Sequence, residues 1–141
     1  SFESSPDGIN LLQKYIYAPS NTIIRMEFVG SKFVYAVEVD TSEGFELCPA
    51  DDCQIDSNCP TGTAHKFSIL QDFEIKNLSA YEAFLADNDI CISGIEIIID
   101  EDGVGWTYDV NTNTNYNSAA EEQAKESAHL KIADYLNSLQ S

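Results

Sequence analysis

The sequence predicts an α+β domain in which hairpins form a largely antiparallel sheet, with a short and a long helix on one face. Apolar and polar residues alternate on both sides of a glycine-containing turn at 22–39 and again at 94–111, which indicates two β-hairpins. Apolar residues recur at helical spacing in 79–88 and 118–139. The chain has 141 residues, enough for one domain with a core and short for two.

The first part of the chain is polar and leads into an apolar segment. Residues 1–8 read SFESSPDG and predict a linker, so we expect a single domain from residue 9 to residue 141. Residues 9–18, INLLQKYIYA, form an apolar segment interrupted by Gln13 and Lys14. We expect a strand there that runs into a connection. From the residues alone, a plain apolar edge strand is the favoured interpretation.

The hairpin at 22–39 turns at Gly30-Ser31, a pair suited to a two-residue turn. Counting back from this turn pairs Arg25 with Ala36. The same count gives one face that forms the main core surface and leaves Arg25 and Glu27 on the opposite face. That core surface comprises Ile24, Met26, Phe28, Phe33, Tyr35 and Val37.

Arg25 is the only arginine in the chain and a candidate catalytic residue. A guanidinium can hold a carboxylate or a phosphate through two parallel hydrogen bonds. A small Ala36 across the strand would leave room for such a ligand. The alternative is a surface salt bridge to Glu27 or Glu38.

Three cysteines lie in the irregular stretch at 40–65, followed by His65. The intervals between Cys48, Cys53 and Cys59 miss the CxxC pairs of most zinc sites, and Cys91 begins a predicted strand. We therefore expect free thiols. Structural zinc and a pair of disulfides are the alternatives.

Both predicted helices begin with a capping box, a Ser followed three residues later by a Glu. Ser79 and Glu82 begin the short helix at 79–88, and Ser118 and Glu121 begin the long one at 118–139. The long helix has one apolar stripe for packing on the sheet, formed by Ala124, Ala128, Ile132, Tyr135 and Leu139.

The hairpin at 94–111 carries the residues that suggest a function. If Asp102-Gly103 forms a two-residue turn, Glu101 pairs with Val104, and counting back places Glu96 directly opposite Asp109. Asn111 shares that face.

Two carboxylates opposite one another repel unless a cation lies between them. With the Asn111 amide oxygen, Glu96 and Asp109 form a hard-oxygen set suited to Mg²⁺, which is usually bound together with substrate phosphates. The residues therefore predict metal-assisted phosphate chemistry. A solvated acidic strand face is the alternative.

This hairpin resembles the metal-binding hairpin of the ATP-grasp superfamily, in its glutamate-ligase-like branch of ATP-dependent carboxylate-amine ligases. The triplets that carry the resemblance are Gly94-Ile95-Glu96 and Asp109-Val110-Asn111. The resemblance extends from about Gly8 to Leu139 and covers only the C-terminal half of an ATP-grasp fold. It implies that Glu96, Asp109 and Asn111 hold Mg²⁺ (or Mn²⁺) against the nucleotide phosphates.

The resemblance also assigns expected roles to two upstream segments. The segment LLQKYI resembles the hinge whose backbone contacts the adenine of ATP, and its matching residues are Gln13, Lys14, Tyr15 and Ile16. Arg25 would lie near the transferred phosphate and the acyl intermediate.

The implied activity is ATP-dependent phosphorylation of a small carboxylate to an acyl phosphate, which an amine or similar nucleophile then attacks. The N-terminal half of the same protein would be required, and this chain alone would be inactive. The alternatives are a non-catalytic acidic interaction module and a simple cation-binding domain on the same scaffold.

The net charge limits the possible partners. A formal charge of −17 argues against unaided binding to nucleic acid or to an anionic membrane surface. No apolar run approaches the ~20 residues needed to span a membrane, and no signal peptide is visible. We therefore expect a cytoplasmic protein. Because the chain begins with Ser rather than Met, we also expect it to be a piece of a longer protein.

Overall fold

A computed structural model describes residues 8–42, 67–71, 73–114, 116 and 118–140. Cys48, Cys53, Cys59 and His65 lie outside these residues, so their expected free thiols stay a prediction. Cys91 is described and is a free thiol. No helix in the described part of the chain is long and apolar enough to cross a membrane.

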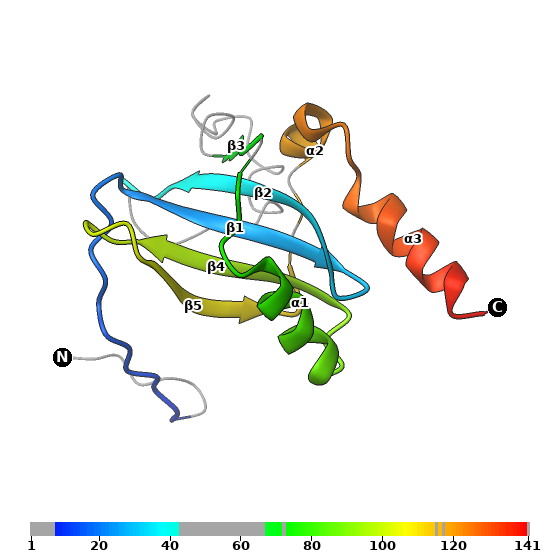
Figure 1. Ribbon diagram of the computed structural model, residues 1–141, viewed down its shortest axis with the longest axis horizontal. Coiled ribbons are helices and arrows are strands. Elements are labelled where there is room, and N and C mark those ends of the chain that lie inside the picture. The colour runs from blue at the N-terminus through cyan, green and yellow to red at the C-terminus, as the bar shows by residue number, and fades with distance from the viewer. Residues whose placement is uncertain (1–7, 43–66, 72, 115, 117, 141) are drawn as a thin grey trace.

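Five antiparallel strands form one sheet in the order β3-β2-β1-β4-β5, as Figure 1 shows. The two predicted hairpins are β1 with β2 and β4 with β5, and β1 pairs with β4 to join them. The α+β class is therefore confirmed. The strands are β1 Thr22–Val29, β2 Lys32–Asp40, β3 Phe67–Ile69, β4 Ile92–Ile99 and β5 Gly105–Asn111, and the helices are α1 Leu78–Asp87, α2 Ser118–Ala124 and α3 Ala128–Ser138.

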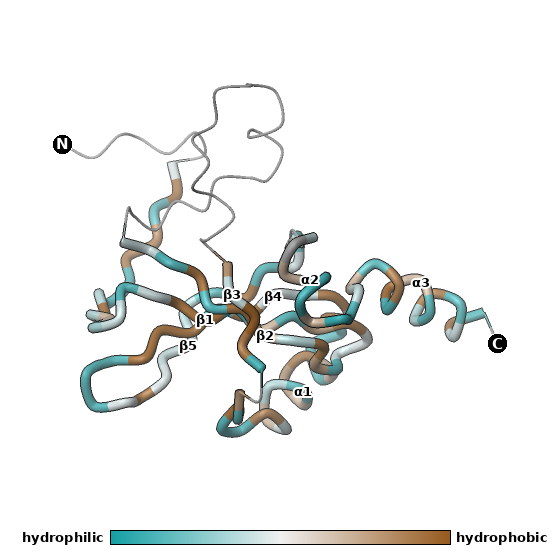
Figure 2. The backbone as a smooth tube through the Cα atoms, turned by 90° about the horizontal axis from the view of Figure 1, so that it is seen from above, coloured by the Kyte–Doolittle hydropathy of each residue, from teal (hydrophilic) through white to brown (hydrophobic). Residues whose placement is uncertain are grey.

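Hydrophobic side chains pack on both faces of the sheet, because consecutive strand residues point to opposite faces. On one face, Met26 and Ile97 pack with Leu85 of α1. On the other, Val39 and Ile98 pack with α2 and α3 through Ala120 and Ala128. Figure 2 shows the apolar strands at the centre of the molecule, with α1 on one side. The helices thus divide between the two faces, whereas the sequence analysis placed both on one face.

The β1–β2 hairpin has the predicted turn but a different register. Gly30 and Ser31 both have positive φ, at 60° and 59°, as a type I′ turn requires. A bulge then shifts the pairing between Glu27 and Phe28, so Arg25 pairs with Val37 and not with Ala36.

Because of that bulge, the core surface differs from the predicted one. Beyond it, Tyr35 and Val37 turn to the face that packs against α2 and α3, and Ala36 takes their expected place beside Met26. The expectation that a small residue opposite Arg25 leaves room for a ligand was therefore wrong.

The β4–β5 hairpin has the predicted pairing of Glu96 with Asp109, although its turn differs from the prediction and a bulge interrupts β5. Asp100 N–H donates to the Val104 carbonyl at 3.0 Å, so the turn spans 101–103 and Glu101 does not pair with Val104. A bulge at Tyr108 then shifts the pairing by one residue, and Glu96 faces Asp109 as predicted. Two departures from the predicted geometry cancel at the acidic pair.

Helix α1 forms without the predicted capping box. Its N-cap is Asn77, which has φ 64° and no side-chain capping bond. The Glu82 carboxylate instead accepts hydrogen bonds from Lys32 Nζ at 2.7 Å and from Phe33 N–H at 3.2 Å. Glu82 thus joins α1 to β2 and does not cap its own helix.

The predicted long helix is two helices, α2 and α3. At Lys125, with φ 56°, the amides of Lys125 and Glu126 donate to the carbonyls of Glu122 and Glu121, both at 3.3 Å. This is the Schellman pattern that ends a helix. Ser127 then caps α3. The predicted stripe does not pack along its whole length, because the Leu139 side chain is exposed.

The predicted strand at 9–18 does not form. These residues have neither helical nor strand structure, and most of their large apolar side chains are exposed. Gln13 and Lys14 lie against strand β5: Gln13 Nε2 donates to the Tyr108 carbonyl at 3.1 Å, and Lys14 Nζ lies 5.3 Å from the Trp106 ring centroid. Side-chain contacts, and not backbone pairing of a strand, thus attach this segment to the sheet.

Candidate functional site

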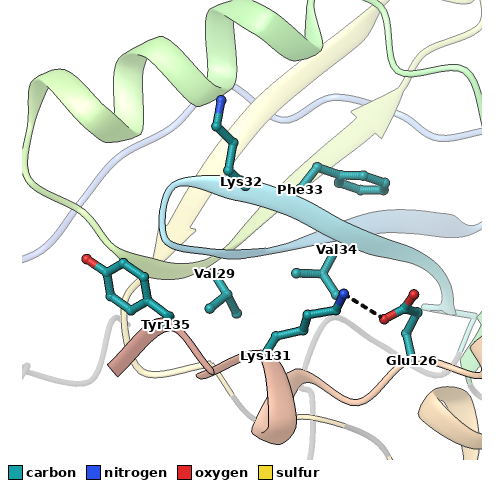
Figure 3. A pocket seen from close by; sticks show the side chains of 7 residues that line it. All are labelled: Val29, Lys32, Phe33, Val34, Glu126, Lys131 and Tyr135. Carbon is teal, nitrogen blue, oxygen red and sulfur yellow. Dashed lines mark ion pairs between the residues drawn. The ribbon is translucent and has the colours of Figure 1, made fainter. Parts of the chain in front are cut away.

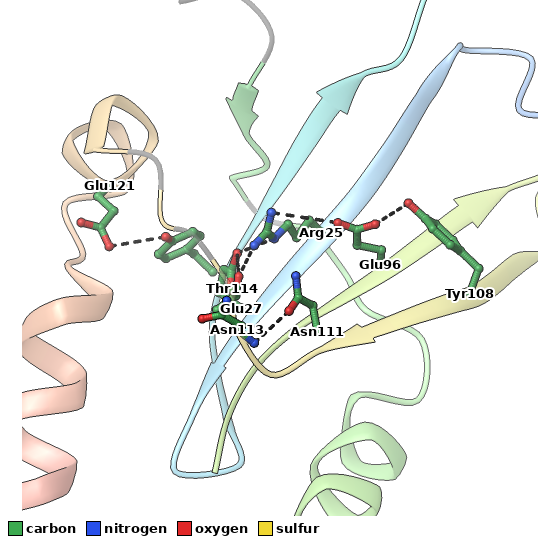
Figure 4. Close-up of polar contacts among 9 residues, drawn as sticks. Arg25, Glu27, Glu96, Tyr108, Asn111, Asn113, Thr114 and Glu121 are labelled. Atoms are coloured by element: carbon green, nitrogen blue, oxygen red, sulfur yellow. Dashed lines mark hydrogen bonds and ion pairs between the residues drawn. The ribbon is translucent and has the colours of Figure 1, made fainter. Parts of the chain in front are cut away.

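Arg25 and the predicted metal ligands lie in two rows across β1, β4 and β5, on the sheet face that packs against α2 and α3. Figure 4 shows Arg25, Glu96 and Asn111 on this face. The first row is Arg25, Glu96 and Asp109, which are successive cross-strand partners. The second is Glu27, Gly94 and Asn111. The structure therefore brings together Arg25 and all three predicted metal ligands.

Gly94 leaves space at the centre of the second row. A Cβ atom at this position would lie 2.9 Å from Thr114 Oγ1 and 3.0 Å from Arg25 Nε. Both distances are tighter than ordinary van der Waals contact. The glycine therefore allows the Arg25 side chain and the loop after β5 to meet above β4.

Arg25 is buried among oxygen atoms, with 7% of its surface exposed. Its Nε lies 2.8 Å from Glu27 Oε1, in an ion pair whose angle is not that of a hydrogen bond. Nη2 donates to Thr114 Oγ1, and Nη1 lies 4.0 Å from Glu96 Oε1. Arg25 thus forms the salt bridge to Glu27 that the sequence offered as an alternative, in the interior and not at the surface.

Glu27 is the carboxylate whose acidity changes most clearly here. Burial raises the pKa of Glu27 to about 7, although Arg25 and the Thr114 hydroxyl act in the opposite direction. Thr114 Oγ1 lies 3.1 Å and 2.9 Å from the two Glu27 oxygens. Glu27 therefore titrates near neutral pH inside a closed cluster.

Glu96 is held by Tyr108, the residue that the β5 bulge adds to this face. The Tyr108 hydroxyl donates to Glu96 Oε2 at 2.5 Å. Burial, followed by the bond to Glu96, raises the pKa of Tyr108 above its usual value. One oxygen of Glu96 is thus fixed by a phenol, while the other faces Arg25.

The remaining predicted ligands keep oxygen atoms available. Asp109 is exposed, and Asn111 Oδ1 accepts from Asn113 N–H at 2.8 Å, which leaves that oxygen a second lone pair. Two carboxylates and an amide on one face fit a hard divalent cation bound by few protein ligands. No group of three or more His, Cys, Asp or Glu side chains suited to a metal occurs within the described ranges.

A second polar group joins this face to the helices. The Glu121 carboxylate accepts from Ala128 N–H at 2.7 Å and from the Tyr35 hydroxyl at 3.5 Å, and it lies 3.7 Å from His129 Nδ1. Burial raises the pKa of Tyr35. Glu121 thereby fixes the start of α3 against the sheet.

The predicted hinge residues differ in their surroundings. Gln13 and Lys14 contact β5, the strand that carries Asp109 and Asn111. Ile16 packs against the core, whereas Tyr15 is 73% exposed. Their contact with adenine stays a prediction.

The fold is similar to that of solved ligase structures. The structure matches "ATP-grasp ligase PsnB complexed with phosphomimetic variant of minimal precursor, Mg, and ADP", with TM-score 0.57 and 14% identity, over 92% of this chain and 35% of that one. The fold is that of an ATP-grasp subdomain.

Two further structures agree. The macrocyclase MdnB from Microcystis aeruginosa MRC matches with TM-score 0.54 and 14% identity, over 85% of this chain and 38% of that one. A RiPP-associated ATP-grasp ligase from Chryseobacterium gregarium, in complex with ADP and a leader and core peptide, matches with TM-score 0.52 and 14% identity, over 86% and 34%. The chain thus spans about a third of each. No protein-family model and no curated protein match the sequence.

A hollow of about 290 Å³ lies between the β1–β2 turn and α3 (Figure 3). It shares no residue with the two rows described above. Lys131 faces Glu126 at 3.2 Å, and Lys32 extends toward α1, where it pairs with Glu82. Both cations are thus already paired, so the hollow offers no free positive charge to an anion.

Proposed function

We propose that this chain is the C-terminal part of an ATP-grasp ligase of the glutamate-ligase-like branch. The ligase activates a carboxylate as an acyl phosphate, using ATP and Mg²⁺, for attack by an amine or a similar nucleophile. The observation that carries the proposal is the pairing of Glu96 with Asp109 across β4 and β5, with Asn111 in the adjacent row.

In this proposal Glu96, Asp109 and Asn111 hold Mg²⁺ or Mn²⁺. When bound, the metal supplies positive charge to the phosphate oxygens. Tyr108 orients Glu96, and Asp109 and Asn111 offer the remaining oxygens. Arg25 is the protein cation on the same face and would steady the charge of the acyl phosphate.

Further contacts are assigned by the same proposal. Gln13, Lys14, Tyr15 and Ile16 form the hinge that meets adenine, and residues 9–141 form one subdomain of a longer cytoplasmic enzyme. The N-terminal half supplies the other phosphate contacts. Because the similar ligases are complexed with precursor peptides, a peptide carboxylate is the first substrate to test.

Metal binding tests the site without needing the other half. Mn²⁺ titrated into the chain, followed by electron paramagnetic resonance and by thermal unfolding, should bind and raise the unfolding temperature. Glu96→Gln and Asp109→Asn should each abolish that rise. Glu101→Gln, in the exposed turn of the same hairpin, is the matched control and should leave it intact.

The metal-site assignment is wrong if the double variant Glu96→Gln, Asp109→Asn binds Mn²⁺ as the unchanged chain does. The non-catalytic acidic interaction module would then be the better interpretation of this face. The chain could instead bind Mn²⁺ but restore no ligase activity when joined to an ATP-grasp N-terminal half. That result would favour the simple cation-binding domain.

A further inference from the structure

Each guanidinium nitrogen of Arg25 faces an oxygen atom, although Nε makes no hydrogen bond. Nε faces Glu27, Nη2 donates to Thr114, and Nη1 faces Glu96, as Figure 4 shows. The sheet forms the floor of this cluster, and Gly94 brings the floor into contact with the Arg25 and Thr114 side chains. Because only 7% of the Arg25 surface is exposed, an anion must displace one of these three groups to reach the guanidinium.

The local charges also oppose an anion. One guanidinium faces two carboxylates, Glu27 at 2.8 Å and Glu96 at 4.0 Å. A phosphate or carboxylate at the same guanidinium would add negative charge in a buried environment, where screening by water is weak. The shorter contact makes Glu27 the stronger competitor.

Thr114 is the part of the cluster that is not held in a strand. Its single hydroxyl can donate one hydrogen bond, and both Glu27 oxygens lie within reach, while it accepts from Arg25. It belongs to the loop that follows β5, whereas Arg25, Glu27 and Glu96 are fixed by strand pairing. Movement of Thr114 is thus the change that disturbs the sheet least.

We infer that Glu27 is an internal counter-anion paired with Arg25, with Thr114 as the hydroxyl that closes the pair, so that an anionic ligand binds Arg25 only by displacing Thr114. Glu27 and Thr114 are therefore positioning residues that set the affinity of Arg25 for an anion. The inference deepens the proposed function and rests on it in one respect, that Arg25 is the group that meets an anion.

The single arginine makes this testable by NMR, because the chain has only one arginine Nε–H signal. Inorganic phosphate is titrated into the full chain without metal, at a pH above the pKa of Glu27. In Glu27→Gln, phosphate should shift this signal with a midpoint about tenfold lower than in the unchanged chain, equivalent to about 1.4 kcal/mol. Glu38→Gln, on β2 and bonded to Thr22, is the matched control and should behave as the unchanged chain.

Thr114 provides an independent pair of variants. Thr114→Val removes the hydroxyl and keeps the shape, so it should lower the phosphate midpoint and speed hydrogen exchange at Arg25 Nε–H. Thr114→Ser keeps the hydroxyl and should restore both to the values of the unchanged chain. A purely structural role would change the unfolding temperature without this separation of Val from Ser.

Equal phosphate midpoints in the unchanged chain and in Glu27→Gln would overturn the inference, as would a signal that ignores phosphate in every variant. Because no metal is present, the result is independent of Mn²⁺ binding at Glu96. A failure to bind Mn²⁺ would contradict the proposed function without affecting the phosphate result. Equal phosphate midpoints would contradict this inference without affecting the metal site.

Discussion

At the scale of single residues, Gly94 is the position that permits the site. We expect Gly94→Ala to lower the free energy of unfolding by about 1–3 kcal/mol, because its Cβ would meet Thr114 Oγ1 and Arg25 Nε. Gly105→Ala is the control, since a Cβ there meets only Ile97 Cδ1 at 4.0 Å. Urea unfolding of both variants measures the difference. Equal losses would mean that the close approach at Gly94 is unimportant.

Glu27 makes stability depend on pH. Its pKa rises from the usual 4.5 to about 7 on folding, so the native state binds this proton more tightly than the unfolded chain. The contribution is therefore fully present below pH 4.5 and is lost as the pH rises through about 7. Glu27→Gln should flatten this part of the stability profile, measured by urea unfolding at several pH values.

Glu101→Gln, which changes an exposed carboxylate, should keep the slope of the unchanged chain. If Glu27→Gln also keeps that slope, some other group is responsible for the pH dependence.

At the scale of elements, the joint between α2 and α3 contains a residue in the left-handed conformation. Lys125 adopts φ 56°, which costs a residue with a side chain about 1–2 kcal/mol. Lys125→Gly should therefore raise the free energy of unfolding by about 0.5–1 kcal/mol after the greater backbone freedom of glycine is counted. Lys125→Ala, which removes the same charge but keeps a Cβ, should give no such gain in thermal unfolding.

The elements also show what the sequence could and could not predict. Alternation and turn residues predicted both hairpins, because these signals are local. The facing pair Glu96 and Asp109 was also predicted, but only because the wider turn and the bulge at Tyr108 cancel. Two bulges have no local signal, one at Val34 of β2, opposite Glu27 and Phe28, and one at Tyr108 of β5. Each depends on what packs against both faces of its strand.

The same limit applies to the polar cluster. Glu27 was placed on the correct face, and its salt bridge to Arg25 was one of two alternatives. Thr114 and Tyr108 were missed as site residues, because one lies in a loop and the other on a bulge. Glu82 and Glu121 matched capping boxes, but tertiary partners at Phe33 and Ala128 used these carboxylates instead.

At the scale of the whole molecule, this chain should not bind ATP tightly. A triphosphate brings about four negative charges to a chain of net charge −17. Arg25 is paired with Glu27, Lys32 with Glu82, and Lys131 with Glu126. Calorimetry with Mg²⁺ and ATP should show no micromolar affinity. Such an affinity in this chain would mean that it carries a complete nucleotide site.

The position of the one arginine has a consequence for proteolysis. A protease specific for arginine can cut this chain only after Arg25, which lies in β1, a strand paired on both sides. The protease cannot reach that bond until the sheet opens. The rate at which two fragments appear therefore reports the opening of the central strands. Fraying at the termini and cleavage in surface loops, which complicate most proteolysis experiments, give no signal with this enzyme.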